Sequence, residues 1–127
     1  MRKTWSLAFA GACVLLAVQS AFVQPPAGKP VLRIATFTVA ESGKQDEVLK
    51  VADAADKEYA RAKGCQWVKF WYHASTGENG SVSLWDSQAD VDAFLKSDAH
   101  KAILEKVKPL SKGDFSSKVF AVHEPRK

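Results

Sequence analysis

The sequence has few cysteines and no long run of basic residues, and both shortages restrict what the protein can be. Two cysteines among 127 residues, Cys13 and Cys65, are too few for a disulfide framework or a thiolate zinc site. The net charge of +4 is spread along the chain, which disfavours a nucleic-acid-binding stripe. The length fits one domain only. With 46% hydrophobic and 25% charged residues, the composition is that of an ordinary folded protein.

The N-terminus has the three-part layout of a secretory signal peptide. Arg2 and Lys3 form a short basic start, residues 7–18 are apolar and uncharged, and small and polar residues follow. The apolar run is shorter than the roughly 20 residues that a membrane-spanning helix needs. We therefore predict a signal peptide over 1–21 and an exported protein, periplasmic or secreted, with no membrane contact after cleavage. An uncleaved membrane anchor is the alternative.

The rest of the chain is predicted to form one α+β domain over 31–124, after a Pro-containing linker at 22–30 and before a tail at 125–127. Apolar periodicity and turn residues predict the elements in order. The predicted elements are a strand at 31–39, a helix at 45–63, a strand at 65–73, a turn at 76–80 with Asn79-Gly80, a strand at 81–85, helices starting at Ser87 and Asp98, and a strand at 116–123. This order predicts a ferredoxin-like split βαβ fold with a four-stranded antiparallel sheet and helices on one face.

Both faces of this sheet are expected to be apolar. The first strand has apolar residues on the side of Ile34 and also on the side of Phe37. We assign the side of Ile34, with Thr36, to the helices. The second strand places Trp67 and Trp71 on one side, and a sheet with one wet face would alternate more cleanly. A second copy of the chain is the expected cover, which predicts a homodimer through the sheet face.

The stretch 83–104, SLWDSQADVDAFLKSDAHKAIL, resembles the antibiotic biosynthesis monooxygenase family of dimeric α+β barrels. The resemblance covers Val31 to Glu124. The residues that carry it are Trp85-Asp86-Ser87, Phe94-Leu95, Ser97-Asp98-Ala99, Lys108-Pro109-Leu110 and Gly64-Cys65. It implies a homodimeric barrel and oxidation of a quinol-like or other aromatic small molecule without a bound cofactor.

Two branches of that family differ from this chain at their functional positions. The haem-degrading branch has an Asn, a Trp and a His where this chain has Thr36, Phe94 and Leu104. Leu104 cannot ligate iron, and haem needs an axial ligand. The His of the quinol oxygenases aligns with Ala99, one position before His100. We predict no cofactor and no metal site.

A cofactor-free oxygenase needs polar groups that deprotonate the substrate and hold the resulting anion. We expect Thr36 and His100 to be catalytic, within a cavity walled by Phe94, Ile103 and Leu104 on one side and by Ile34, Thr36 and Tyr72 on the other. The substrate-binding candidates are Thr38, Tyr72, Trp85, Phe94 and Leu104. Each has a structural alternative, such as core packing for Trp85. Two functions stay open: a small monooxygenase, or a non-catalytic dimeric barrel that binds a small hydrophobic ligand or acts in a stress response.

The signal-peptide prediction has a direct test. Residues 1 to about 20 should be absent from the mature chain, because signal peptidase removes such segments. Intact-mass measurement of the exported protein checks this. A soluble protein that still contains Arg2 and Lys3 would contradict cleavage.

Overall fold

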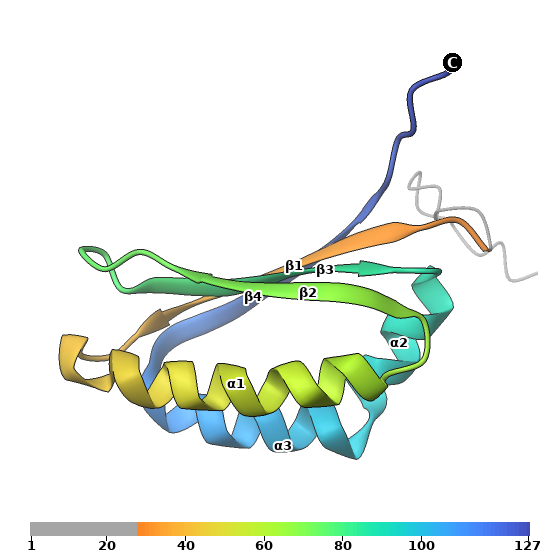
Figure 1. The fold of residues 1–127 in the computed structure, drawn as a ribbon. Coiled ribbons are helices and arrows are strands. Elements are labelled where there is room, and N and C mark those ends of the chain that lie inside the picture. Colours follow the sequence, from red (N-terminus) through yellow and green to blue (C-terminus); the bar gives the residue numbers. More distant parts are fainter. Residues whose placement is uncertain (1–27) are drawn as a thin grey trace, which may run out of the picture.

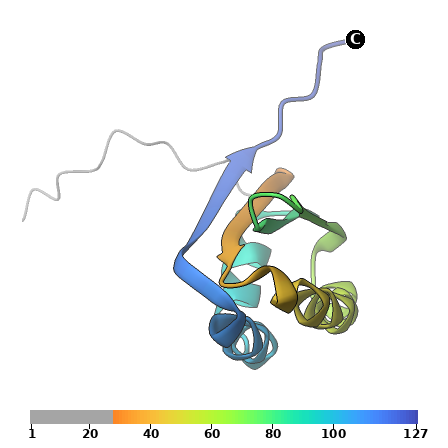
Figure 2. The ribbon, with the colours of Figure 1, turned by 90° about the vertical axis from the view of Figure 1, so that its left-hand side faces the viewer.

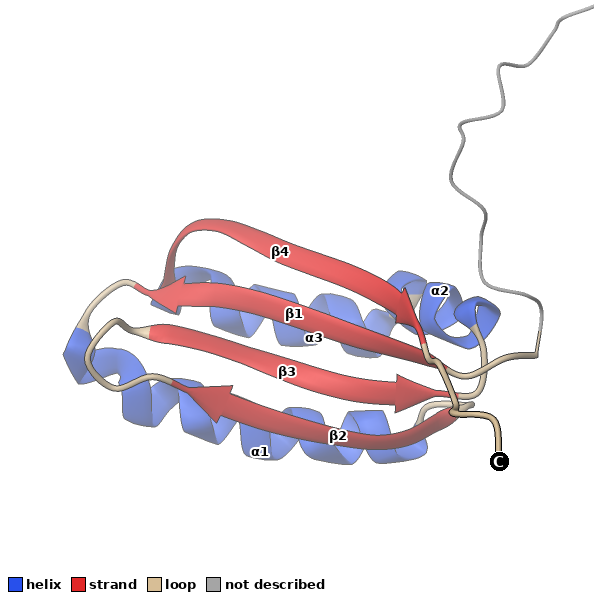
Figure 3. Ribbon diagram, turned by 90° about the horizontal axis from the view of Figure 1, so that it is seen from above, coloured by secondary structure: helices blue, strands red, loops and turns tan. Residues whose placement is uncertain are grey.

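One antiparallel sheet of four strands has all its helices on a single face (Figures 1 and 3). The structure is a computed structural model that describes residues 28–127, so the predicted signal peptide and most of the predicted linker lie outside the described residues. The elements are β1 (Val31–Val39), η1 (Ser42–Lys44), α1 (Gln45–Arg61), β2 (Cys65–Tyr72), β3 (Glu78–Trp85), α2 (Gln88–Lys96), α3 (Asp98–Val107), η2 (Lys108–Leu110) and β4 (Ser111–Ala121). The strand order β2-β3-β1-β4 confirms the ferredoxin-like α+β fold.

Helix α1 begins where the sequence predicts and lies beside α3 under the sheet (Figure 2). Its buried residues Val48, Ala55 and Tyr59 recur at helical spacing and face the sheet. The helix ends at Arg61, slightly before the predicted end. Gly64 makes the turn into β2 with a positive φ of 82°, and a Cβ there would also collide with the Asp90 side chain.

The main core lies between α1, α2 and one end of the sheet. Trp85 is fully buried, and its ring centroid is 5.2 Å from that of Phe94. Burying a Trp side chain contributes on the order of 4 kcal/mol through the apolar area it removes from water. The buried members of this cluster are Val31, Ala55, Tyr59, Trp85, Val91 and Phe94.

The hairpin between β2 and β3 turns earlier than the sequence predicts. The backbone N–H of Gly77 donates to the carbonyl of His73 at 2.9 Å, and Gly77 has the positive φ of 75°. The predicted Asn79-Gly80 turn is wrong, since both residues lie inside β3. Asn79 is there because its buried amide pairs with another side chain, and Gly80 because the Trp71 ring lies against it.

Ser97 is the shared end of the two C-terminal helices. As the residue that caps the end of α2, it donates from Oγ to the carbonyl of Phe94 at 2.6 Å. As the N-cap of α3, the same oxygen accepts from the backbone N–H of His100 at 3.2 Å. Ser87, where the sequence predicts the start of a helix, is the N-cap of α2, and its hydroxyl accepts from the Asp90 N–H. The Ser97 cap fixes His100 in the first turn of α3.

Strand β4 is longer than predicted, starting at Ser111 rather than at residue 116. Its first residues pair with the end of β1, where Val39 lies opposite Ser111. The register then shifts between Thr36 and Thr38, and Gly113 takes a positive φ of 73° near this irregularity. Gly113 therefore lies within a bulged part of β4.

Strand β1 presents to the helices the opposite side from the one predicted. Val31 and Val39 are buried in the helix-facing clusters, and Arg33 on the same side is bonded to α1. Because side chains alternate along a strand, Ile34, Thr36 and Thr38 project from the open face of the sheet. The assignment of Thr36 and Thr38 to the helix side is wrong. The two sides of β1 are similarly apolar, so alternation alone did not distinguish them.

Among residues 28–127, none of the helices is long and apolar enough to cross a membrane.

Candidate functional site

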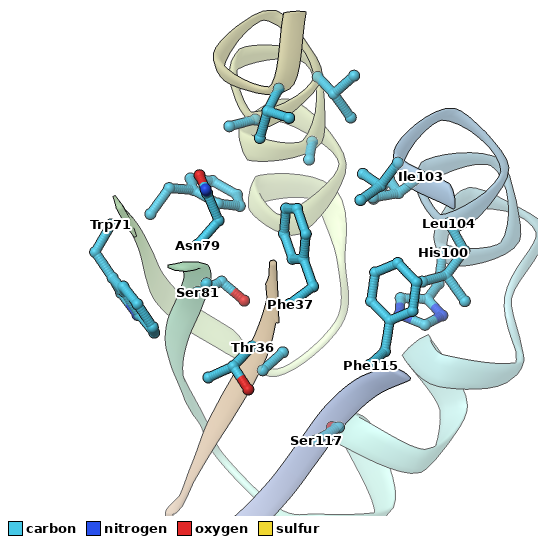
Figure 4. A pocket seen from close by; sticks show the side chains of 18 of the residues that line it. Thr36, Phe37, Trp71, Asn79, Ser81, His100, Ile103, Leu104, Phe115 and Ser117 are labelled. Atoms are coloured by element: carbon cyan, nitrogen blue, oxygen red, sulfur yellow. The ribbon is translucent and has the colours of Figure 1, made fainter. Parts of the chain in front are cut away.

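A cavity of about 290 Å³ lies between the helix-facing side of the sheet and helices α1 and α3 (Figure 4). Most of its wall is apolar. Phe37 and Phe115 come from neighbouring strands with ring centroids 5.5 Å apart, while Ile103 and Leu104 come from α3. Among residues 28–127, Arg33 is the one side chain of fixed charge that lines the cavity.

Arg33 holds three elements together from inside this wall. Its side chain is 4% exposed. Nε donates to Oγ of Ser117 on β4 at 2.9 Å, and Nη1 donates to the hydroxyl of Tyr59 on α1 at 3.0 Å. Both acceptors are neutral groups, so neither balances the guanidinium charge.

His100 lies in the same cavity, in the first turn of α3, and its side chain is buried. Its ring packs edge-on against Phe94, with centroids 5.4 Å apart. Burial lowers the pKa of His100, the positive charge of Arg33 lowers it further, and a backbone hydrogen bond at Leu95 acts in the opposite direction. The imidazole is therefore neutral at pH 7 and can accept a proton.

The other polar groups of the cavity are mostly bonded within the protein. Gln45 and Asn79 pair through their amides, with N–O distances of 2.8 and 2.9 Å, and Asn79 also donates to the carbonyl of Gly77. This leaves Arg33 and His100 as the groups best placed to act on a ligand. Among residues 28–127, no three His, Cys, Asp or Glu side chains are grouped to hold a metal ion.

The structure brings only part of the predicted site to the cavity. His100 and Leu104 line it as expected, and so does Ile103. Thr36 borders the cavity, but the alternation of β1 turns its side chain toward the open face. Thr36 is therefore not positioned as a catalytic group.

Four predicted substrate-binding residues do not line the cavity. Trp85 is a core residue whose Nε1 donates to Oγ of Ser83 at 2.8 Å, and Phe94 is buried in the same cluster. Tyr72 is 51% exposed near the end of β2, where the sheet extends past the main core. Thr38 is on the open face for the same reason as Thr36.

Sequence reasoning missed Arg33, Tyr59 and Ser117. One signal for Arg33 was available, because it is the single charged residue within an otherwise apolar strand. A charge among residues that pack against helices indicates a special role, since burying it is costly. Its partners on α1 and β4 lie 26 and 84 residues away, and no local pattern links them.

The family of the chain follows from its sequence. The model of the antibiotic biosynthesis monooxygenase family matches residues 30–106, and the chain belongs to this family. The resemblance of the 83–104 stretch is thereby confirmed. No curated protein shows significant sequence similarity to the chain.

Solved structures with the same fold include proteins of three bacteria. Rv0793 of Mycobacterium tuberculosis is 19% identical with a TM-score of 0.67, covering 78% of this chain and 100% of its own. A candidate antibiotic biosynthesis monooxygenase of Caulobacter crescentus is 22% identical with a TM-score of 0.67, covering 76% and 92%. SnoaB of Streptomyces nogalater, a cofactor-independent oxygenase crystallised as a point mutant, is 14% identical with a TM-score of 0.64, covering 76% and 96%. At these identities the likeness concerns the fold.

The buried imidazole predicts a specific pH dependence of stability. Because the folded state lowers the pKa of His100, the unfolded chain takes up the proton first as the pH falls through about 6.5. The free energy of unfolding should therefore fall as the pH drops below about 6.5. Denaturant titrations should show a smaller loss for His100→Gln than for the unchanged protein. His73→Gln, at an exposed histidine, is the control and should keep the full loss. Equal pH profiles for the protein and His100→Gln would contradict the burial argument.

Proposed function

We propose that the protein is an exported, cofactor-independent oxygenase of a quinol-like or other electron-rich aromatic molecule. One observation carries the proposal: a neutral imidazole and a buried guanidinium face the same largely apolar cavity. Membership of the monooxygenase family supports the reaction class. The predicted signal peptide supports export.

The first step, removal of a proton from the substrate, requires a base and a group that stabilises the resulting anion. His100 accepts the proton of an aromatic hydroxyl or of an activated CH₂ beside a carbonyl, because its imidazole is neutral at pH 7. Arg33 stabilises the oxyanion that forms, since a hydrogen bond from a charged donor to an oxyanion is stronger than one between neutral groups. The apolar wall holds the ring system.

The second step needs only dioxygen as the oxidant. The substrate anion passes one electron to O₂, and the resulting radical pair joins to form a hydroperoxide. Where the attacked carbon was a CH₂ group, loss of water leaves a C=O group. One oxygen atom ends in the product and the other in water, so that no external reductant is consumed.

Oxygen consumption with a panel of quinols and anthrone-like phenols tests the proposal. At least one compound should be oxidised by the purified protein without added cofactor. His100→Gln should lower kcat by about 10²–10⁴-fold, the usual contribution of a general base. The deficit should shrink at alkaline pH, where the substrate ionises unaided. His73→Gln is the matched control and should retain activity.

Two outcomes would contradict this function. Tight binding of an aromatic compound without oxygen uptake would favour the ligand-binding barrel without catalysis. Equal turnover by His100→Gln at neutral pH would remove His100 from the mechanism.

We also propose that a second copy of the chain covers the open face of the sheet. The helices of residues 28–127 all lie on the opposite face (Figure 3). Trp67 is 42% exposed and Phe120 45%, and Trp71 lies close against Gly80 on the same face. Exposed apolar side chains gathered on one face mark association surfaces, and a self-complementary sheet face suits a two-fold dimer.

Light scattering tests this assembly with one charge placed on the open face. The unchanged protein should have the mass of a dimer at micromolar concentration. Val82→Lys, in the middle of that face, should raise the dissociation constant by roughly a hundredfold or more, because it buries an unpaired charge. Ala54→Lys adds the same charge on the exposed side of α1 and should leave the dimer intact. A monomeric unchanged protein would rule out the dimer.

A further inference from the structure

The guanidinium of Arg33 has no acidic partner in the structure. The three salt bridges among the described residues lie on the surface, and none of them includes Arg33. The chain segment before residue 28 contains no Asp or Glu, so it has no acidic side chain to supply. The positive charge is buried and uncompensated.

Arg33 keeps donors that its two hydrogen bonds do not use. A guanidinium has five N–H donors, and the bonds to Ser117 and Tyr59 take one each. Arg33 lines the cavity, and in the part of the chain that the structure describes no Asp, Glu or Lys lines it with Arg33. His100 stays uncharged beside it at neutral pH. The site therefore presents one positive charge within an apolar wall.

We propose that the cavity binds an apolar aromatic molecule as a monoanion, with one ionised oxygen group, a phenolate or a carboxylate, on Arg33. An inorganic anion does not match the aromatic and aliphatic walls formed by Phe37, Phe115 and Ile103. A dianion brings a second negative charge, and the lining of described residues offers no second cation to pair with it. This proposal narrows the substrate class of the proposed oxygenase. It rests on the proposed function only for the choice of this cavity as the binding site.

Calorimetry with two probes of the same shape tests the charge preference. The unchanged protein should bind 2-naphthoate at least about tenfold more tightly than neutral 2-naphthamide at pH 7.5, because only the carboxylate offers charge-assisted bonds. Arg33→Met should abolish this preference, and Arg33→Lys should retain part of it. Arg61→Met, at an exposed arginine, is the matched control and should keep the full preference.

A second probe separates phenolates from carboxylates. Absorbance of 4-nitrophenol reports its phenolate, and the pKa of the bound phenol should lie below that of the free compound in the unchanged protein but not in Arg33→Met. A lowered phenol pKa without a naphthoate preference assigns the site to phenols alone, and a naphthoate preference without a lowered phenol pKa assigns it to carboxylates. No preference in either measurement on the unchanged protein overturns the proposal, whether or not the Arg33 variants fold.

These measurements do not depend on oxygen chemistry. Anion-selective binding with no oxygen uptake would leave this inference standing and remove the proposed oxygenase. Oxidation of neutral substrates with no anion preference would do the reverse.

Discussion

Alternation of side chains along β1 decides which residues meet the helices and which stay on the open face. When Val31 and Val39 pack against the helices, the residue two positions after Val31 must follow them. Arg33 is therefore carried into the interior, where it bonds to α1 and β4. The same alternation puts Ile34 and Thr36 on the face that we propose a second copy covers. The same alternation thus places Arg33 at the cavity and Ile34 on the open face.

The buried arginine is costly for the isolated chain. Removing a charge from water costs several kcal/mol even after the protein relaxes. Two hydrogen bonds that involve a charged group return roughly 1.5–3 kcal/mol each, which offsets part of this cost. A ligand oxygen that carries negative charge would complete the compensation. Arg33 then lowers the stability of the protein without ligand and gives the cavity its preference for anions. Such an exchange of stability for function is common.

The sequence predicted the order of elements, the bounds of β1 and the start of a helix at Ser87, because these depend on local patterns of hydrophobicity and on side chains near helix ends. His100 and Leu104 were also placed correctly at the cavity, since they lie on the first turns of a helix with a clear apolar side. The orientation of β1 was not predictable from apolar content that is nearly equal on its two sides. The network around Arg33 joins three elements distant in sequence, and only the folded structure brings them together. The hairpin was misplaced because Asn79 serves a buried amide pair and not a turn.

Ser97 connects the core to the chemistry of the cavity through a single hydroxyl. It bonds to the carbonyl of Phe94, which packs on Trp85, and to the backbone of His100. The same hydroxyl therefore fixes the end of α2 and the first turn of α3, which carries the imidazole that lines the cavity. A substitution at Ser97 would disturb both helix ends at once, and with them the packing at Phe94 and the position of His100.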